Sequence, residues 1–171
     1  SFAGNRYARW SAFLPRPSKI RHYLASLRGP RPEVWVGHNP MGRLAVSALY
    51  LLLLIMAVTG LVRAGTDIYF PPFGAFAQDY VAADPATASE IKPYDESLVD
   101  KQKYAQLKAF KSPFGDIHVF TAYALLALIV LHITAVIITE RREGGALISA
   151  MFTGKKYLRG RPEDDRRKDP M

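Results

Sequence analysis

The sequence predicts an all-α membrane protein with two transmembrane helices and short amphipathic helices at the membrane interface. Residues 44–62 and 117–139 contain no Asp, Glu, Lys or Arg. These runs are 19 and 23 residues long, close to the roughly 20 residues that a helix needs to cross a bilayer. The alternative, that each run is a buried core helix of a soluble protein, is weaker. The rest of the chain is too polar to bury two helices as apolar as these.

The amino-terminal part, residues 1–40, is predicted to be a cytoplasmic amphipathic segment. Within it, residues 17–28 place apolar side chains at helical spacing, with Ser18 as a candidate cap. The basic residues of this helix suit an anionic membrane surface, although a helix lying on another subunit would show the same pattern. Asn39, as a cap, then marks the start of the first transmembrane helix, predicted over residues 41–64.

Residues 65–115 are predicted to form a periplasmic loop. A connection of this length usually has structure of its own and a function. Residues 97–111 are charged and predict a short helix, and residues 112–116 (Ser-Pro-Phe-Gly-Asp) predict a break that caps the next helix. The second transmembrane helix is predicted over residues 116–140, followed by a basic cytoplasmic tail over residues 141–171.

The distribution of charge predicts the orientation. Residues 1–43 hold eight Lys and Arg with one Glu, and residues 140–171 hold nine with six acids. Residues 63–116 hold six Lys and Arg against eight acids. Both ends are therefore expected to be cytoplasmic, with membrane lipid as a partner. The net charge of +8 follows from this topology, and no nucleic-acid-binding motif accompanies it.

The chain has no cysteine. This excludes disulfides, thiolate metal sites, iron–sulfur clusters and covalent haem attachment from the chain. A haem in this protein would be held non-covalently, with His or Met as axial ligand.

Two histidines in the second apolar run are the main functional signal. His118 and His132 are fourteen residues apart, which on a helix places them on one face, within roughly 40° of each other and about 21 Å apart along the axis. Histidine inside a membrane is costly without a partner, and this pair predicts axial ligands for the iron of two haems. The alternative is two isolated histidines that are bonded to neighbouring helices or lie near the membrane interface. The second ring nitrogen needs an acceptor, for which helix carbonyls, Thr121 and Thr134 are candidates.

Other residues are candidates for contacts with haem. Ala122, Leu125 and Ile129 would pack against it, although ordinary helix packing in lipid favours similar residues. Arg43 and Arg141 would pair with haem propionates, although stop-transfer charge explains most such arginines.

His38 allows two interpretations. It is either a proton-accepting residue in a quinone pocket or a residue that fixes the turn into the first transmembrane helix.

Several motifs resemble the prokaryotic cytochrome b-561 family, which is related to the cytochrome b subunit of nickel–iron hydrogenases. They are residues 4–10 (GNRYARW), 37–42 (GHNPMG), 59–61 (TGL), the helix with His118 and His132, and residues 151–156 (MFTGKK). The resemblance covers nearly the whole chain. It implies four transmembrane helices that hold two b haems in the bacterial inner membrane, with His118 and His132 as ligands on the last helix.

By the same resemblance, the remaining axial ligands lie on two helices that would precede residue 1. The chain is therefore expected to be the carboxy-terminal half of a four-helix haem-binding bundle, or else another membrane subunit supplies those helices. The family relays electrons between the quinone pool and a partner such as a periplasmic c-type cytochrome or a dehydrogenase. The chain is thus expected to be an electron-transfer subunit rather than a stand-alone enzyme. The alternative is a non-redox membrane anchor that docks a redox partner through residues 65–115.

Overall fold

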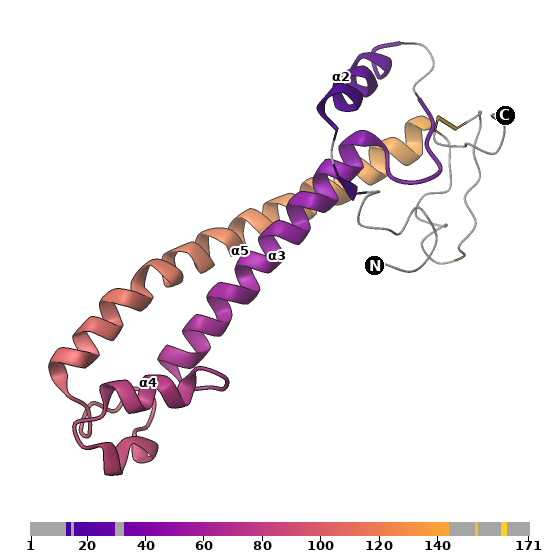
Figure 1. The fold of residues 1–171 in the computed structure, drawn as a ribbon. Coiled ribbons are helices and arrows are strands. Elements are labelled where there is room, and N and C mark those ends of the chain that lie inside the picture. Colours follow the sequence, from indigo (N-terminus) through magenta and orange to yellow (C-terminus); the bar gives the residue numbers. More distant parts are fainter. Residues whose placement is uncertain (1–12, 15, 30–32, 144–152, 154–161, 164–171) are drawn as a thin grey trace, which may run out of the picture. The chain divides into compact units, whose positions relative to one another are not determined.

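The described part of the chain is helical. The structure is a computed structural model that describes residues 13–14, 16–29, 33–143, 153 and 162–163. Within these residues no strand is formed, apart from an isolated antiparallel bridge between Ala82 and Val99. The predicted all-α class is confirmed. The elements are α2 (Pro17–Ser26), α3 (Pro40–Asp67), α4 (Gly74–Val81), the 3₁₀ helix η2 (Pro85–Glu90) and α5 (Lys101–Glu143) (Figure 1).

Helices α3 and α5 are both long and apolar enough to cross a membrane. In the most apolar part of each, only 6% of the residues are buried. Large side chains such as Leu54, Phe120 and Leu131 are exposed by 61%, 75% and 65%. A core helix of a soluble protein would be buried, so these surfaces suit lipid and further transmembrane helices. The chain is an all-α membrane protein, as predicted.

The helices extend further into the predicted loop than the sequence suggested. Helix α3 continues to Asp67, and α5 begins at Lys101 and runs without interruption through Pro113. The predicted break at residues 112–116 is therefore wrong. Proline removes one backbone hydrogen bond and crowds the preceding turn. The helix tolerates this because the turns before Pro113 are held by packing around the buried Leu107.

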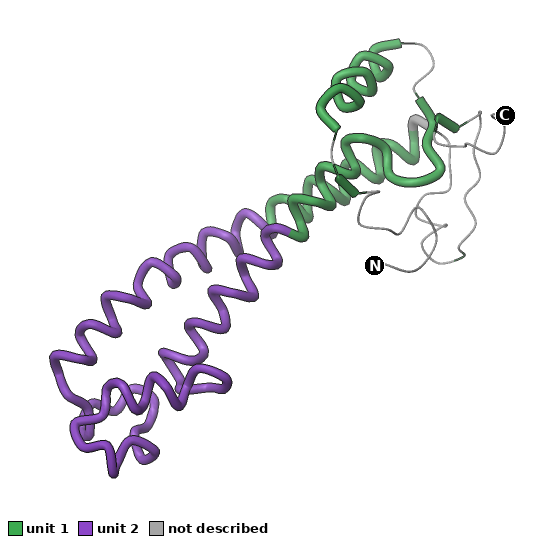
Figure 2. Tube along the Cα trace, viewed as in Figure 1, with its two compact units in different colours: residues 1–50, 126–171 green, residues 51–125 purple. Residues whose placement is uncertain are grey.

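The chain forms two compact units, residues 1–50 with 126–171 and residues 51–125 (Figure 2). In the first unit, Asn39 caps α3 as predicted, since its Oδ1 accepts a hydrogen bond from the Gly42 nitrogen at 2.7 Å. Its Nδ2 donates to the hydroxyl of the buried Tyr23 of α2 at 2.8 Å. Ser18 does not cap α2, because the helix already begins at Pro17 and its N-cap is Arg16.

The second unit gives residues 68–100 a fold of their own. Helices α4 and η2 and the start of α5 surround a small set of buried side chains, which we call the loop core: Ala77, Val81, Ala82, Ala88, Ile91, Val99 and Leu107. Gly74 begins α4 directly against the backbone of Tyr69, where a β-carbon would collide with the Tyr69 carbonyl. The close approach requires glycine. The segment between the apolar runs is thus a packed structure.

Some sequence motifs lie outside the described residues. These are residues 4–10, most of residues 151–156, and most of the basic tail over residues 141–171.

Candidate functional site

The ring of His118 is held by the opposite helix of the second unit. Its Nδ1 lies 2.8 Å from Thr59 Oγ1 on α3. The Thr59 hydroxyl also lies 2.7 Å from the Ile55 carbonyl oxygen and 3.3 Å from that of Met56, and it donates its single hydrogen to these carbonyls of its own helix. The Thr59 oxygen then accepts from His118, which places the ring hydrogen on Nδ1. The lone pair of the neutral imidazole is left on Nε2.

Gly60 is the second residue of α3 that contacts the His118 ring. A β-carbon at Gly60 would lie 3.4 Å from His118 Cε1 and 3.9 Å from Nδ1, so the imidazole packs closely on the backbone of α3. The neighbouring Thr59 is only 4% exposed. The Thr59-Gly60 pair therefore holds the ring in position and favours the tautomer with its hydrogen on Nδ1.

This arrangement fits an axial ligand of haem iron. Histidines that bind metals almost always donate their other ring N–H to a fixed acceptor, which also makes the ligand more basic. His118 has such an acceptor and keeps Nε2 for a metal. The described residues contain no group of three His, Cys, Asp or Glu that would hold a bare metal ion. A haem needs only axial ligands from the protein, because the porphyrin holds the iron itself.

His132 lies further along α5, in the first unit, and is partly buried. No residue in the described ranges forms a hydrogen bond with its ring. Thr134, one of the two predicted acceptors, donates instead to the Val130 carbonyl of its own helix at 2.8 Å. Thr121, the other predicted acceptor, is 3% exposed, but the partner of His118 is Thr59. The sequence analysis therefore missed the acceptor, although residues 59–61 had been noted as a motif.

The residues expected to pack against haem lie on α5. In the second unit, Ala122 and Leu125 follow His118 at helical spacing and are partly buried. Phe120 and Tyr123, on the other side of this helix, are 75% and 70% exposed. In the first unit, Ile129 is 39% exposed. The histidine face of the second unit thus has smaller and less exposed side chains than the opposite face.

The residues expected near the cytoplasmic end hold the turn before α3. Arg43 Nε donates to the His38 carbonyl oxygen at 3.0 Å, and its guanidinium lies 5.4 Å from the centre of the Trp35 ring. The exposed His38 ring packs edge-on against Phe13, with 5.3 Å between ring centres. Arg141 is exposed near the end of α5. The predicted roles of these residues at haem or quinone stay predictions.

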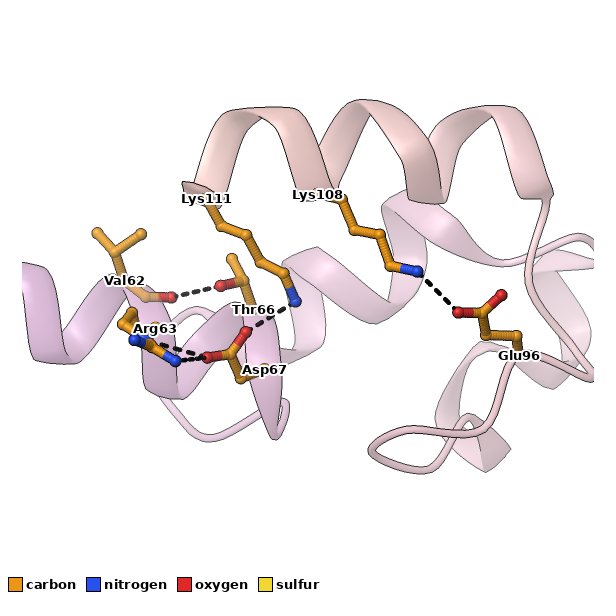
Figure 3. Close-up of polar contacts among 7 residues, drawn as sticks. All are labelled: Val62, Arg63, Thr66, Asp67, Glu96, Lys108 and Lys111. Atoms are coloured by element: carbon orange, nitrogen blue, oxygen red, sulfur yellow. Dashed lines mark hydrogen bonds and ion pairs between the residues drawn. The ribbon is translucent and has the colours of Figure 1, made fainter. Parts of the chain in front are cut away.

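A second polar feature near His118 was not found by sequence analysis. Asp67 Oδ2 accepts from Arg63 Nε at 3.1 Å and from Nη2 at 3.0 Å, and its Oδ1 pairs with Lys111 Nζ at 2.7 Å (Figure 3). We call Arg63, Asp67 and Lys111 the ionic cluster. A separate exposed pair joins Lys108 to Glu96 at 2.8 Å. The spacing of Arg63 and Asp67 could have indicated their pairing, but no local signal points to Lys111.

Three groups between the long helices have perturbed pKa values. Burial raises the pKa of Tyr69, and the neighbouring Tyr104 and Glu96 add to the effect. Hydrogen bonds from the backbone and side chain of Ser97 lower the pKa of Asp95. Asp95 therefore stays ionised and Tyr69 stays neutral at pH 7.

The pKa of Asp100 is also lowered, chiefly by the backbone N–H of Lys103. Asp100 therefore stays negatively charged near neutral pH, at the start of α5.

Comparison with known proteins identifies the family. The model of the prokaryotic cytochrome b561 family matches residues 2–154. No curated protein and no solved structure matches the chain. Because the family match covers most of the sequence, the chain belongs to the prokaryotic cytochrome b561 family. It is accordingly a membrane b-type cytochrome that binds haem b and takes part in electron transfer.

Proposed function

We propose that His118 and His132 each supply one axial ligand to one of two b haems. Through these haems the chain relays electrons between the quinone pool and a periplasmic c-type cytochrome or an associated dehydrogenase. The observation that carries the proposal is the hydrogen bond between His118 Nδ1 and Thr59 Oγ1, which leaves Nε2 as a metal-binding nitrogen. Haem supplies the one-electron chemistry, and the helices hold the ligand in a fixed orientation.

The proposal assigns the other axial ligands to histidines on helices outside this chain. Of its four histidines, His22 pairs with Glu33 beside α2, and His38 lies in the turn before α3. Neither belongs to a transmembrane helix. Two further transmembrane helices that carry these ligands would complete the four-helix bundle.

The orientation follows from the charges. With basic ends and a slightly acidic segment 63–116, the proposal puts both ends of the chain on the cytoplasmic side of the bacterial inner membrane and residues 63–116 on the periplasmic side. The haem at His118 then lies toward the periplasmic partner, and the haem at His132 toward the cytoplasm. In this orientation His38 is the candidate for a quinone site on the cytoplasmic side, and Arg43 is a candidate partner for a propionate of the second haem.

Haem content tests the ligand assignment. We expect His118→Ala and His132→Ala each to remove one of two haems, measured by the pyridine haemochrome method on purified protein. His22→Ala is the matched control, because that ring bonds to Glu33 outside the transmembrane helices, and it should keep both haems. Two haems retained in both transmembrane variants would reject the assignment.

A further inference from the structure

The ionic cluster has more positive than negative charge. Two cationic side chains, Arg63 and Lys111, share the single carboxylate of Asp67. The Asp67 and Lys111 side chains are only 19% and 20% exposed, while Arg63 is 41% exposed. A partly buried excess cation at the end of a transmembrane segment is costly unless an anion accompanies it. The cluster is therefore built to accept a further anionic group.

The ionic cluster lies next to His118 and to Thr59 and Gly60, which hold its ring. Arg63 follows Thr59 by one helical turn on α3, about 6 Å along the axis. On α5, Gly115 precedes His118 by three residues, and a β-carbon at Gly115 would lie 3.4 Å from Arg63 Nη1. The guanidinium thus lies against α5 within about one turn of the histidine. Lys111 comes one turn earlier on the same helix.

The cations keep donors for another carboxylate. Arg63 binds Asp67 through Nε and Nη2, so Nη1, on the side toward Gly115, can still donate. Lys111 uses one contact of its ammonium group for Asp67 and has three hydrogens. Arginine in particular binds carboxylates with strong, directional hydrogen bonds.

Haem carries two propionate carboxylates on one edge of its ring. We infer that Arg63 and Lys111 bind a propionate of the haem ligated by His118, an inference that rests on the ligand assignment proposed above. The two cations then position the haem from its edge, while Asp67 holds them in place and limits their net charge to one.

The test uses the complete protein with the His132→Ala substitution, so that one haem remains. After haem removal, the protein is reconstituted either with haem or with haem dimethyl ester, which has no carboxylates. We expect Arg63→Met to speed the loss of haem about tenfold, the size of one charge-assisted hydrogen bond. The ester should leave this variant and its parent at the same rate. Arg63→Lys keeps the positive charge but lacks the planar guanidinium group. Its rate of haem loss should lie between those of the parent and Arg63→Met.

The midpoint potential gives a second measurement. Removing a cation beside the haem favours the ferric state, so Arg63→Met should lower the potential, whereas Asp67→Asn should raise it. Lys108→Met is the matched control, because Lys108 pairs with Glu96 and lies 4.3 Å from the centre of the Tyr104 ring, so that the substitution removes a cation from the same helix without breaking a contact of Asp67. It should change neither quantity.

Equal acceleration of haem and ester loss by Arg63→Met, or no acceleration of either, would overturn the inference while leaving His118 as the ligand. If the protein with both His118→Ala and His132→Ala still retains haem, the ligand assignment itself fails. The two failures are thus distinguished.

Discussion

Replacing Thr59 with valine isolates the contribution of one hydroxyl to the haem site. Valine has nearly the same shape and branching as threonine, so the packing beside Gly60 and the helix propensity of α3 change little. The substitution removes the only hydrogen-bond acceptor of His118 Nδ1 in the described structure. The Ile55 carbonyl loses only the additional bond from the Thr59 hydroxyl.

The size of the effect follows from burial. Thr59 is 4% exposed, so water is largely excluded from replacing its hydroxyl. An unsatisfied buried donor costs roughly 1–3 kcal/mol. Loss of an outer hydrogen bond to a metal-binding histidine lowers metal affinity by about tenfold to a hundredfold, which agrees with this range. We therefore expect Thr59→Val to weaken haem binding at His118 by about this factor. The midpoint potential of the haem at His118 should also rise in this variant. Without the hydrogen bond to Thr59 the His118 imidazole is less basic and stabilises ferric iron less.

Haem dissociation into excess apomyoglobin and a redox titration measure the two effects. Thr59→Ser keeps the hydroxyl and should behave like the parent. Thr134→Val is the matched control on α5, because the Thr134 hydroxyl bonds only to the Val130 carbonyl of its own helix. A Thr59→Val protein with the parent's dissociation rate and potential would refute the role of this hydrogen bond in holding the ligand.

Two further predictions concern the segment between the long helices. Gly74→Ala should destabilise the loop core by at least about 2 kcal/mol, because its β-carbon would collide with the Tyr69 backbone. Limited proteolysis within residues 83–98 should then accelerate, whereas exposed Ala75→Ser should have no effect. Asp100, whose carboxylate accepts hydrogen bonds from the Gln102 and Lys103 nitrogens at 2.9 and 3.0 Å, has a pKa below its ordinary value of 3.8. The stabilisation of the start of α5 by the ionised Asp100 carboxylate is therefore complete above pH 3.8. It is lost as the pH falls through the lower pKa of the folded state. Amide protection at Gln102 and Lys103 should decrease in this acidic range, but not in Asp100→Asn, and equal decreases in both proteins would exclude this carboxylate as the cause.

The helices were predictable because their signals are local. The charge-free runs indicated both transmembrane helices, and Asn39 before Pro40 indicated the start of the first. The continuity of α5 was not predictable, because Pro113 is locally a helix breaker. It is tolerated where the preceding turns are fixed by contacts distant in sequence, such as those of Leu107 with the loop core. A single sequence does not contain that information in any local pattern.

In the candidate site, too, the features within one helix were predictable and the contacts between two helices were not. The spacing of His118 and His132 is a property of one helix, so it was visible in the sequence. The acceptor Thr59 lies 59 residues away from His118 and was found only through the pairing of α3 with α5 in the second unit. Sequence reasoning looked for acceptors on the same helix, where Thr134 in fact bonds to its own backbone. Lys111 was missed for the same reason, since its partner Asp67 belongs to the other helix.

Several acidic residues between the long helices have structural partners, which bears on how a redox partner would dock there. Asp100 caps α5, and Glu96 pairs with Lys108. The negative charges of Glu96 and Asp100 are therefore partly compensated by groups of the same chain, which reduces their attraction for a basic partner. Exposed aromatic side chains are better candidates for a contact surface, because Phe76 and Tyr94 are 75% and 82% exposed. Such residues suit either a membrane interface or a protein partner.

The second unit links this segment physically to the ligand. It contains the loop core, the ionic cluster, Thr59 and His118 within residues 51–125. Helix α5 runs unbroken from Lys101 to His118, and Leu107 fixes its first turns in the loop core. A continuous helix transmits displacement along its axis because each backbone N–H is bonded to a carbonyl one turn earlier. Changes in the loop core, such as Gly74→Ala, are therefore expected to reach the environment of His118 through α5.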